Sequence, residues 1–371
     1  MVKNTVAFSE NEDKFKALEE VVERINRDGE PMLVIYFAPA NLFEFYSKSL
    51  HKAYEKAIVI GASTYVSFSS QGAGKHALSA IAIYEGIECA ADVLQDISHY
   101  PLQYISRIDE ACEKLSGVDN ALCLEYCTAS GNCEELVQDT FKAALEHRHM
   151  DTIGGSAGAP TANDTAYVSL NGEVYEEAAV FVIIRNLGGR ILTYKENMYT
   201  PTEHVLTATD VDCDERIVYE YNNESAAGLV ASTLGMDYEV FKNEVFAFHP
   251  MGRLRGDEVY ITAPKEIMPD GSVSYFARIY NYTKLAIMEP LEIEKVWKET
   301  SANIHYEIEN PSFTIAVNCI IRSMYFENNN KFGNFCQFLK DEFGSYVGMS
   351  GFGEQYNYEH VNMTMVLLMF E

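Results

Sequence analysis

The chain is poor in basic residues. Its 371 residues include 28 lysines and arginines against 55 aspartates and glutamates, so its formal charge is −27. Proteins that bind nucleic acid contact the phosphates with a basic face, and anionic membrane surfaces attract basic segments. We therefore expect neither a nucleic acid nor a membrane surface as a partner.

Long apolar runs are also missing. No segment approaches the roughly 18 apolar residues that a membrane-spanning helix needs. The first residues, Met1 to Asn4, lead into acidic sequence and lack the basic and apolar pattern of a signal peptide. We therefore expect a cytoplasmic protein. Hydrophobic residues still make up 47% of the chain, which predicts a folded core rather than disorder.

Metal-binding spacings are absent as well. The eight cysteines form no Cys-x-x-Cys pair, and the nine histidines show no metal-ligand spacing. We therefore predict free thiols, no metal site and no resident cofactor. Haem stays open as an alternative, because a haem needs only one axial ligand and a histidine such as His249 or His360 could supply it.

What the chain does contain is a strand–helix–strand pattern that recurs three times. In each unit an apolar run suited to a buried strand precedes a helix, and a second strand then ends in glycine and serine. The units span residues 31–63, 120–158 and 313–351. In the third unit we expect a strand over 313–322 and a helix over 331–343.

The turns that close these units are candidate binding loops. A strand, a helix and a strand that return to one sheet form a right-handed crossover, and ligands bind beyond the carboxyl ends of such strands. Ser63 and Ser156 stand at two of these strand ends. We therefore expect the recurring Gly/Ser turns to line one or two clefts.

The segments between the units predict antiparallel strands. Asn171-Gly172 is the strongest short hairpin signal, and a helix is expected over 224–235. Further strands are expected over 76–83, 178–185, 216–223, 259–263, 272–280 and 284–288. We therefore predict a mixed α/β (α+β) fold in which helices cover mixed sheets, with two closely packed halves over 1–223 and 224–371.

Short motifs along nearly the whole chain resemble the FIST sensory module, which has an N-terminal and a C-terminal half. The motifs follow the family order, and they are 59–63, 153–158, 205–207, 226–235, 318–322, 351–354 and 361–364. One departure is Thr64-Tyr65 in the first turn, where the family has a further glycine. This difference leaves the backbone shape of that turn open.

The resemblance implies an intracellular sensor of bacterial signal transduction, including chemotaxis, that binds a small molecule and catalyses no reaction. Amino acids or their derivatives are the ligand class that it implies. Its output would be a fused or separate chemoreceptor, kinase or cyclic-dinucleotide enzyme, or the module would act alone. One subgroup of the family is associated with haem and nitric oxide, so a haem-based nitric oxide sensor is the alternative. Whether the chain forms a homodimer is left open.

The resemblance also implies ligand-binding residues. The family's arginine, Gly-Glu and Asn-x-Thr positions fall on Arg322, Gly353-Glu354 and Asn362 with Thr364. A guanidinium such as that of Arg322 binds a carboxylate bidentately, or it pairs with a local acid such as Glu354. If Glu354 instead binds an ammonium group, the two side chains would recognise both ends of an amino acid. The expected ligand site is Ser63, Ser156, Arg322, Gly353, Glu354 and Asn362.

A serine- or cysteine-dependent hydrolase is the remaining alternative. Residues 154–158 match the Gly-x-Ser-x-Gly pattern of a nucleophile elbow. That elbow needs a helix directly after the serine, whereas Ala159-Pro160 and a strand pattern follow here. The context therefore favours Ser156 as a hydrogen-bond donor within a loop, and we expect no catalytic residue.

Overall fold

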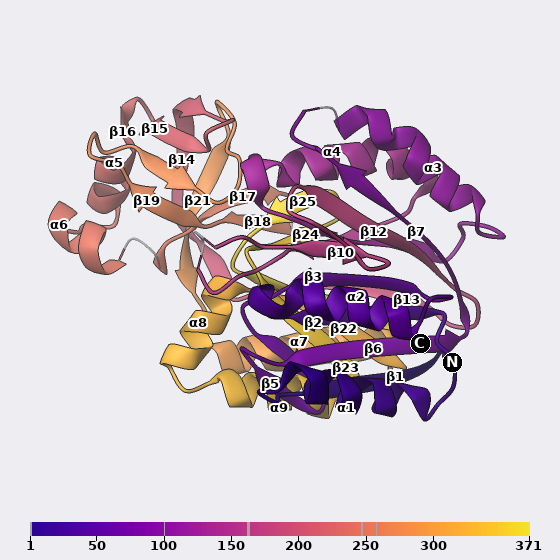
Figure 1. The fold of residues 1–371 in the computed structure, drawn as a ribbon. Coiled ribbons are helices and arrows are strands. Elements are labelled where there is room, and N and C mark those ends of the chain that lie inside the picture. The colour runs from indigo at the N-terminus through magenta and orange to yellow at the C-terminus, as the bar shows by residue number, and fades with distance from the viewer. Residues whose placement is uncertain (1, 100, 162–163, 246–247, 257) are drawn as a thin grey trace. The chain divides into compact units, whose positions relative to one another are not determined.

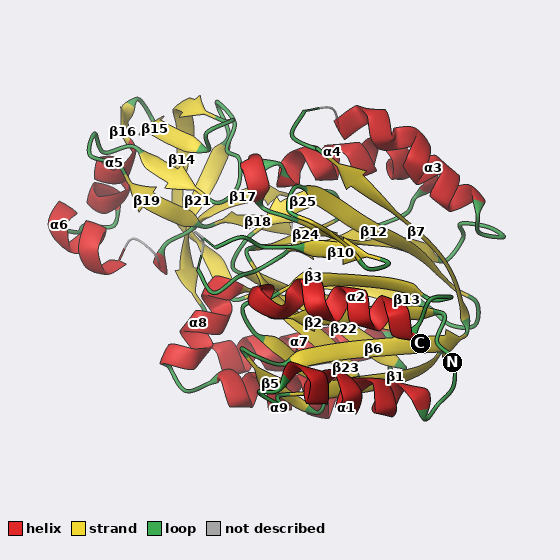
Figure 2. Ribbon diagram, in the orientation of Figure 1, coloured by secondary structure: helices red, strands yellow, loops and turns green. Residues whose placement is uncertain are grey.

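The fold is mixed α/β, as the sequence predicts, in a computed structural model that describes residues 2–99, 101–161, 164–245, 248–256 and 258–371 (Figures 1 and 2). The chain divides into two compact units. The first is Met1–Glu196 with Glu299–Tyr358 and Met365–Glu371, and the second is Asn197–Lys298 with Glu359–Thr364. The expected boundary between 1–223 and 224–371 refers to the two halves of the sequence motifs and not to these compact units. It stays a prediction.

The first unit contains three sheets with one strand plan. The first sheet has the order β1 (Lys3–Ser9), β6 (Leu78–Glu85), β2 (Leu33–Ala38), β3 (Ile58–Ser63), β10 (Val168–Leu170) and β11 (Glu173–Tyr175). The second contains β7 (Ile87–Gln95), β12 (Ala178–Asn186), β8 (Ala121–Cys127), β9 (Thr152–Ser156) and β24 (Gly353–Tyr356). The third has the order β13 (Ile191–Asn197), β26 (Thr364–Phe370), β22 (Phe313–Cys319), β23 (Tyr346–Gly351), β4 (Ser67–Ser69) and β5 (Gly72–Gly74).

The three predicted strand–helix–strand units are confirmed. Their strands pair in parallel, β2 with β3, β8 with β9 and β22 with β23. The connecting helices are α2 (Phe43–Ala53), α4 (Glu134–Leu145) and α9 (Phe332–Phe343). Sequence explains α4 well, because Glu134 and Glu135 lie in its first turn and Lys142 in its last, where each charge complements the helix dipole.

After each unit the chain sends a strand pair or strand to a different sheet. The hairpin β4–β5 follows β3 in sequence but pairs with β23 of the third sheet. The hairpin β10–β11 follows β9 but pairs with β3 of the first sheet, and β24 follows β23 but pairs with β9 of the second. The exchange therefore links the three sheets in a closed cycle.

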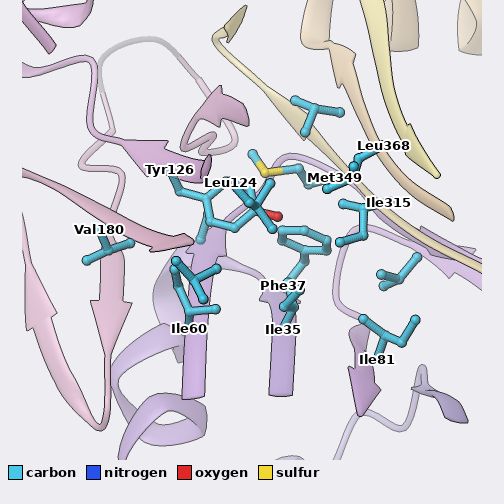
Figure 3. Packing of buried hydrophobic residues seen from close by; sticks show 14 of the residues in the cluster. Ile35, Phe37, Ile60, Ile81, Leu124, Tyr126, Val180, Ile315, Met349 and Leu368 are labelled. Atoms are coloured by element: carbon cyan, nitrogen blue, oxygen red, sulfur yellow. The ribbon is translucent and has the colours of Figure 1, made fainter. Parts of the chain in front are cut away.

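The three sheets of the first unit share one apolar core. Alternate residues of their strands contribute to it, including Ile35 of β2, Leu124 of β8 and Ile315 of β22, and all are at most 1% exposed. Figure 3 shows these side chains pointing toward one another from the three sheets, with Tyr126 and Met349 among them. Burial of this set holds the ends of β3, β9 and β23 in fixed positions.

Helices cover the other faces of the sheets. The first sheet carries α2 and α1 (Lys14–Asn26), and the Asp13 side chain caps α1 by accepting from two of its backbone N–H groups. The second sheet carries α4 and α3 (Ile105–Glu113), as Figure 1 shows. The third packs against α9 and α8 (Ile320–Asn328). Short 3₁₀ segments are η1 (Ala40–Leu42), η2 (Pro101–Tyr104), η3 (Ser130–Asn132) and η4 (Glu146–Arg148).

The second unit is built on one antiparallel sheet. Its order is β18 (Glu258–Thr262), β17 (Met251–Arg255), β21 (Lys284–Pro290), β14 (Tyr199–Asp212), β15 (Ile217–Tyr221), β20 (Val273–Tyr275) and β19 (Pro264–Ile267), with β16 (Glu224–Ser225) beside β15. The unit also contains α5 (Ala226–Thr233), α6 (Tyr238–Val240), the π-helical η5 (Phe241–Val245) and β25 (Glu359–Val361). Helix α7 (Ile293–Glu307) begins here and ends in the first unit. The apolar core of the second unit includes Tyr221, Val230 and Ile287.

Two predicted strands are wrong in extent. The strand expected over 313–322 ends at Cys319, and Ile320, Ile321 and Arg322 begin helix α8. The β-branched pair Ile320-Ile321 continues the apolar run, so periodicity alone extends the strand. The strand expected over 272–280 is only the three residues of β20. The predicted hairpin at Asn171-Gly172 is confirmed, because both residues have positive φ angles of 50° and 86°.

Candidate functional site

The three Gly/Ser turns join in a cycle of backbone hydrogen bonds, which we call the turn cycle. The N–H of Gly158 donates to the carbonyl of Ser63 at 2.8 Å. The N–H of Tyr65 donates to the carbonyl of Ser350, and the N–H of Phe352 donates to that of Ser156, both at 3.1 Å. Each donor stands two residues after its own serine, so the three turns occupy equivalent places. The recurrence seen in the sequence is therefore a recurrence in the structure.

Close backbone approach explains the glycines of two of these turns. A Cβ atom on Gly351 would lie 2.2 Å from the carbonyl oxygen of Ser156, and one on Gly158 would lie 2.5 Å from that of Ser350. Tyr65 fills the corresponding place in the first turn and makes the same backbone bond without glycine. Its hydroxyl donates to Glu327 at 2.8 Å. The departure from the family pattern thus preserves the hydrogen-bond cycle.

The serine side chains at these strand ends are enclosed in the protein. Ser63 Oγ donates to the carbonyl of Gly158 and accepts from the N–H of Tyr167, each at 2.8 Å. Ser156 Oγ accepts from the amide of Gln355 at 3.0 Å. Both serines are 0% exposed. Within the described part of the chain, no histidine or lysine bonds to either hydroxyl, so no base stands ready to activate it.

Gly353 and Glu354 lie beside this network on β24. In the antiparallel pairing with β9, Gly353 is opposite Ser156 and Glu354 is opposite Gly155. Glu354 is 0% exposed, and Gly353 is also buried. The structure therefore brings Ser63, Ser156, Gly353 and Glu354 together around the strand ends. Their contact with a ligand stays a prediction.

Arg322 has a different acidic partner from the one considered above. Its guanidinium donates to the carboxylate of Glu196 and, at 3.2 Å, to the backbone carbonyl of the same residue. Both side chains are completely buried. The ring of Phe326 lies 5.6 Å from the guanidinium carbon. The ion pair seen is thus with Glu196 at the end of β13, rather than with Glu354.

Asn362 and His360 lie in the second unit. The side-chain oxygen of Asn362 accepts from the N–H of Ala263 at 3.2 Å, and its backbone N–H donates to Ile261. His360 Nε2 lies 3.2 Å from the carbonyl oxygen of Phe276, and it is 2% exposed. The amide of Asn362 therefore fixes the local backbone in this structure. His249, the other histidine considered for haem, has Nδ1 3.0 Å from the carbonyl oxygen of Met288.

Sequence analysis does not identify the buried Glu125 as a candidate residue. Glu125 lies in the middle of β8 with 0% exposure, and Gln138 of α4 donates to its Oε1 at 2.8 Å. Its Oε2 has no hydrogen-bond partner among the described residues. Burial raises the pKa of this carboxyl to about 8, so it is mostly protonated at neutral pH. In the sequence, Glu125 stands between Leu124 and Tyr126. The only sign of a functional role is a glutamate inside an otherwise apolar strand.

A hollow of about 300 Å³ opens beyond the carboxyl end of β8. We call it the first hollow; its walls are Thr128, Ala129, Ser130, Asp164, Thr165, Ala166, Glu176 and Phe352. Phe352 belongs to the turn cycle, and Thr128 follows β8 directly. The hollow therefore lies where parallel strands of an α/β sheet present their ligand sites.

A second hollow of about 360 Å³ lies beyond the equivalent end of β2. Its walls are Ala40, Asn41, Glu44, Tyr167, Val174 and Glu176. The two hollows share Glu176, and the segment 164–167 lines one and then the other. A third hollow, of about 530 Å³, lies at the opposite strand ends and contains Arg148 and His149 beside acids. Sequence reasoning missed these wall residues, because loop residues carry no periodic signal.

Metal and thiol chemistry find little support in the geometry. Within the described residues, Asp96, His99 and Glu177 form the group close enough together to hold an ion, but Asp96 and His99 are exposed. Burial raises the pKa of the Cys127 thiol well above its usual value, although its sulfur lies 3.7 Å from Ser156 Oγ. Nucleophilic cysteines need a lowered pKa instead.

No described helix has the length and apolar character needed to cross a bilayer.

Comparison with known families accounts for the recurring motifs. The FIST N domain matches residues 32–224, and the FIST C domain matches residues 226–357. A comparison with curated proteins finds no match for the chain. FIST domains are sensory domains of signal-transduction proteins. Because the two matches cover nearly all of the sequence, in the order expected from its motifs, the chain belongs to the FIST family.

Proposed function

We propose that the chain is a cytoplasmic, non-catalytic sensory domain that binds a small amino-acid-like molecule in the first hollow. The observation that carries this proposal is the place of that hollow beside the turn cycle, with Phe352 in its wall. Hydroxyl groups of Ser130 and Thr165 offer hydrogen bonds, and Asp164 and Glu176 offer carboxylates to an amine. A ligand seated there would contact the backbone that links all three sheets.

The enclosure of the serines supports a binding role over a hydrolytic one. Ser156 accepts from an amide and has no general base beside it among the described residues, and Ala157 and Gly158 after the end of β9 form no helix. Neither feature suits the elbow of a serine hydrolase. The signal would pass to an output domain in the same or another protein, when the ligand favours one of two packings of the turns.

Haem binding is the second candidate. It would use a histidine as axial ligand, and His249 and His360 each already face a backbone carbonyl oxygen. Such a bond uses one ring nitrogen and leaves the other for iron, as in many metal-ligating histidines. Neither histidine lines the first or the second hollow, and for this reason the small polar ligand is the first candidate.

A thermal-shift screen of the whole chain tests the proposal. Amino acids, amino-acid derivatives and hemin are added separately, and a ligand that binds only the native state raises the melting temperature. A rise of several degrees with one amino-acid class supports the proposal, provided that it is lost in the Phe352→Ala variant. A rise with hemin alone favours the haem sensor. No rise with any compound contradicts both.

A further inference from the structure

Glu176 is a carboxylate shared by two hollows. It lines both the first hollow, beyond β8, and the second hollow, beyond β2. It is exposed, and it has neither an ion pair nor a hydrogen bond to its side chain among the described residues. Its charge is therefore available to a ligand in either hollow or to one that extends through both.

Both hollows carry negative charge. Asp164 joins Glu176 in the first, and Glu44 joins it in the second. Among the described wall residues of the two there is no lysine, arginine or histidine. Glu44 accepts from Lys48 at 2.5 Å, so its charge is partly balanced from outside the wall. A ligand with anionic groups would find no positive side chain in either wall, whereas an ammonium group finds a carboxylate in each hollow.

The overall acidity of the chain does not by itself explain this pattern. The third hollow lies in the same unit, and there Asp119 and Asp151 stand with Arg148 and His149. Acid-only walls thus distinguish the two hollows that share Glu176.

Each of the two hollows also has an aromatic wall. Phe352 lines the first and Tyr167 the second, and both rings are half-buried. Aromatic faces attract organic cations and pack against methylene groups. The remaining polar groups are uncharged, such as Ser130 and Asn41, and they can accept hydrogen bonds from a ligand.

We infer that the ligand is an aliphatic diamine, an amino-acid derivative without its carboxylate, which extends through both hollows. One ammonium group occupies the first hollow with Asp164 and Glu176, and the other occupies the second with Glu44. The methylene chain passes the aromatic rings of Phe352 and Tyr167. This inference rests on the proposed function and specifies the charge of its ligand.

Isothermal titration calorimetry of the whole chain tests the inference with four probes: 1,4-diaminobutane, butylamine, ornithine and succinate. The diamine is expected to bind one site at least about tenfold more tightly than butylamine, because it adds a second charged contact. Ornithine is expected to bind more weakly than the diamine, since its carboxylate meets acid-lined walls. Succinate is expected not to bind. Added salt is expected to weaken the diamine complex.

Three variants separate the hollows from the general acidity. Glu176→Gln is expected to weaken diamine binding about tenfold. Glu44→Gln is expected to weaken the diamine about threefold and leave butylamine unchanged, because only the second ammonium group is affected. Glu23→Gln is the matched control: this exposed glutamate lies on α1, lines neither hollow, and should change nothing.

Other results would overturn the inference. Equal affinity for diamine and butylamine, or several weak sites that Glu176→Gln leaves intact, would show unspecific attraction to an acidic protein. Tighter binding of ornithine than of the diamine, lost in Phe352→Ala, would refute the diamine and leave the proposed sensory function standing. If none of the probes binds and the thermal-shift screen is also silent, both the inference and the proposed function fail.

Discussion

The guanidinium of Arg322 and the carboxylate of Glu196 form an ion pair from which water is excluded. Both side chains have 0% exposure, and 126 residues separate them in sequence. Glu196 lies in β13, next to the point where the chain passes into the second unit. Arg322 lies in the first turn of α8. The pair thus fixes the helix after β22 to the strand from which the second unit departs.

Removal of one partner from this pair is expected to destabilise the protein strongly. In Arg322→Met, the Glu196 carboxylate would remain buried without compensation, at a cost of about 3–5 kcal/mol. The double variant Arg322→Met/Glu196→Leu should recover much of that loss, since no buried charge remains. Urea unfolding followed by circular dichroism measures both differences.

An exposed ion pair provides the control for this experiment. Lys48 and Glu44 lie four residues apart on α2, with side chains 65% and 70% exposed. Lys48→Met should leave the urea midpoint nearly unchanged, because exposed ion pairs contribute little to stability. Equal effects of Lys48→Met and Arg322→Met would contradict the role that burial gives to Arg322.

The hydrogen-bond cycle of the turns predicts that Gly351 tolerates no larger side chain. In Gly351→Ala the new Cβ would lie 2.2 Å from the Ser156 carbonyl oxygen, so the turn would have to shift. We expect a loss of about 1–3 kcal/mol in unfolding free energy. The loss is measurable as a lower urea midpoint, with the same glycine-to-alanine change made at a second position for comparison.

Gly333 is that second position. It lies in the first turn of α9, and a Cβ there has nothing within 4 Å. Gly333→Ala should stabilise the protein by up to about 1 kcal/mol, because alanine favours the helix. If the two variants behave alike, close approach at the turn cycle is not what requires Gly351.

The elements that sequence predicts well are those with a local signal. The buried run 33–38 and the amphipathic α4 carry their periodicity within a dozen residues, and Asn171-Gly172 specifies its own hairpin. The partner of a strand is a different matter. Nothing local in 67–74 indicates that β4–β5 joins β23, because that choice depends on the packing of all three sheets.

The candidate site divides in the same way. Ser63 and Ser156 are identifiable because apolar strands that end in glycine, alanine and serine are recognisable in sequence. The partner of Arg322 is not, since Glu196 lies in a strand that carries no motif. The charged walls of the two hollows come from loop residues such as Asp164 and Glu176, whose proximity arises only from the sheet exchange.

Thiol chemistry provides a test of the hydrolase alternative. Burial raises the pKa of Cys127 and Cys123 well above the usual value, and that of Cys89 to about 11. These thiols should therefore react slowly with iodoacetamide in the native protein at neutral pH, because the thiolate is the reactive form. Mass spectrometry before and after denaturation in urea should show the labels appear only on unfolding. Rapid native labelling of Cys127, beside Ser156, would favour a nucleophilic role.

Glu125 predicts a specific dependence of stability on pH. The pKa of its carboxyl is about 8 in the folded protein against 4.5 for an ordinary glutamate. Below pH 4.5 the group is protonated in both folded and unfolded chains, so its contribution to stability is fully present. As the pH rises toward 8 the unfolded chain loses this proton while the folded protein keeps it, so stability falls by up to about 1.4 kcal/mol per pH unit.

Glu125→Gln isolates this contribution, because glutamine keeps the shape and cannot ionise. The unfolding free energy of the variant is subtracted from that of the unchanged protein at several values between pH 5 and 8. We expect the difference to shift steadily in favour of the variant as the pH rises. Glu110→Gln on α3, an exposed position, is the control for the glutamate-to-glutamine change itself. A pH-independent difference for Glu125→Gln would mean that the buried carboxyl ionises in the folded state as readily as in the unfolded chain.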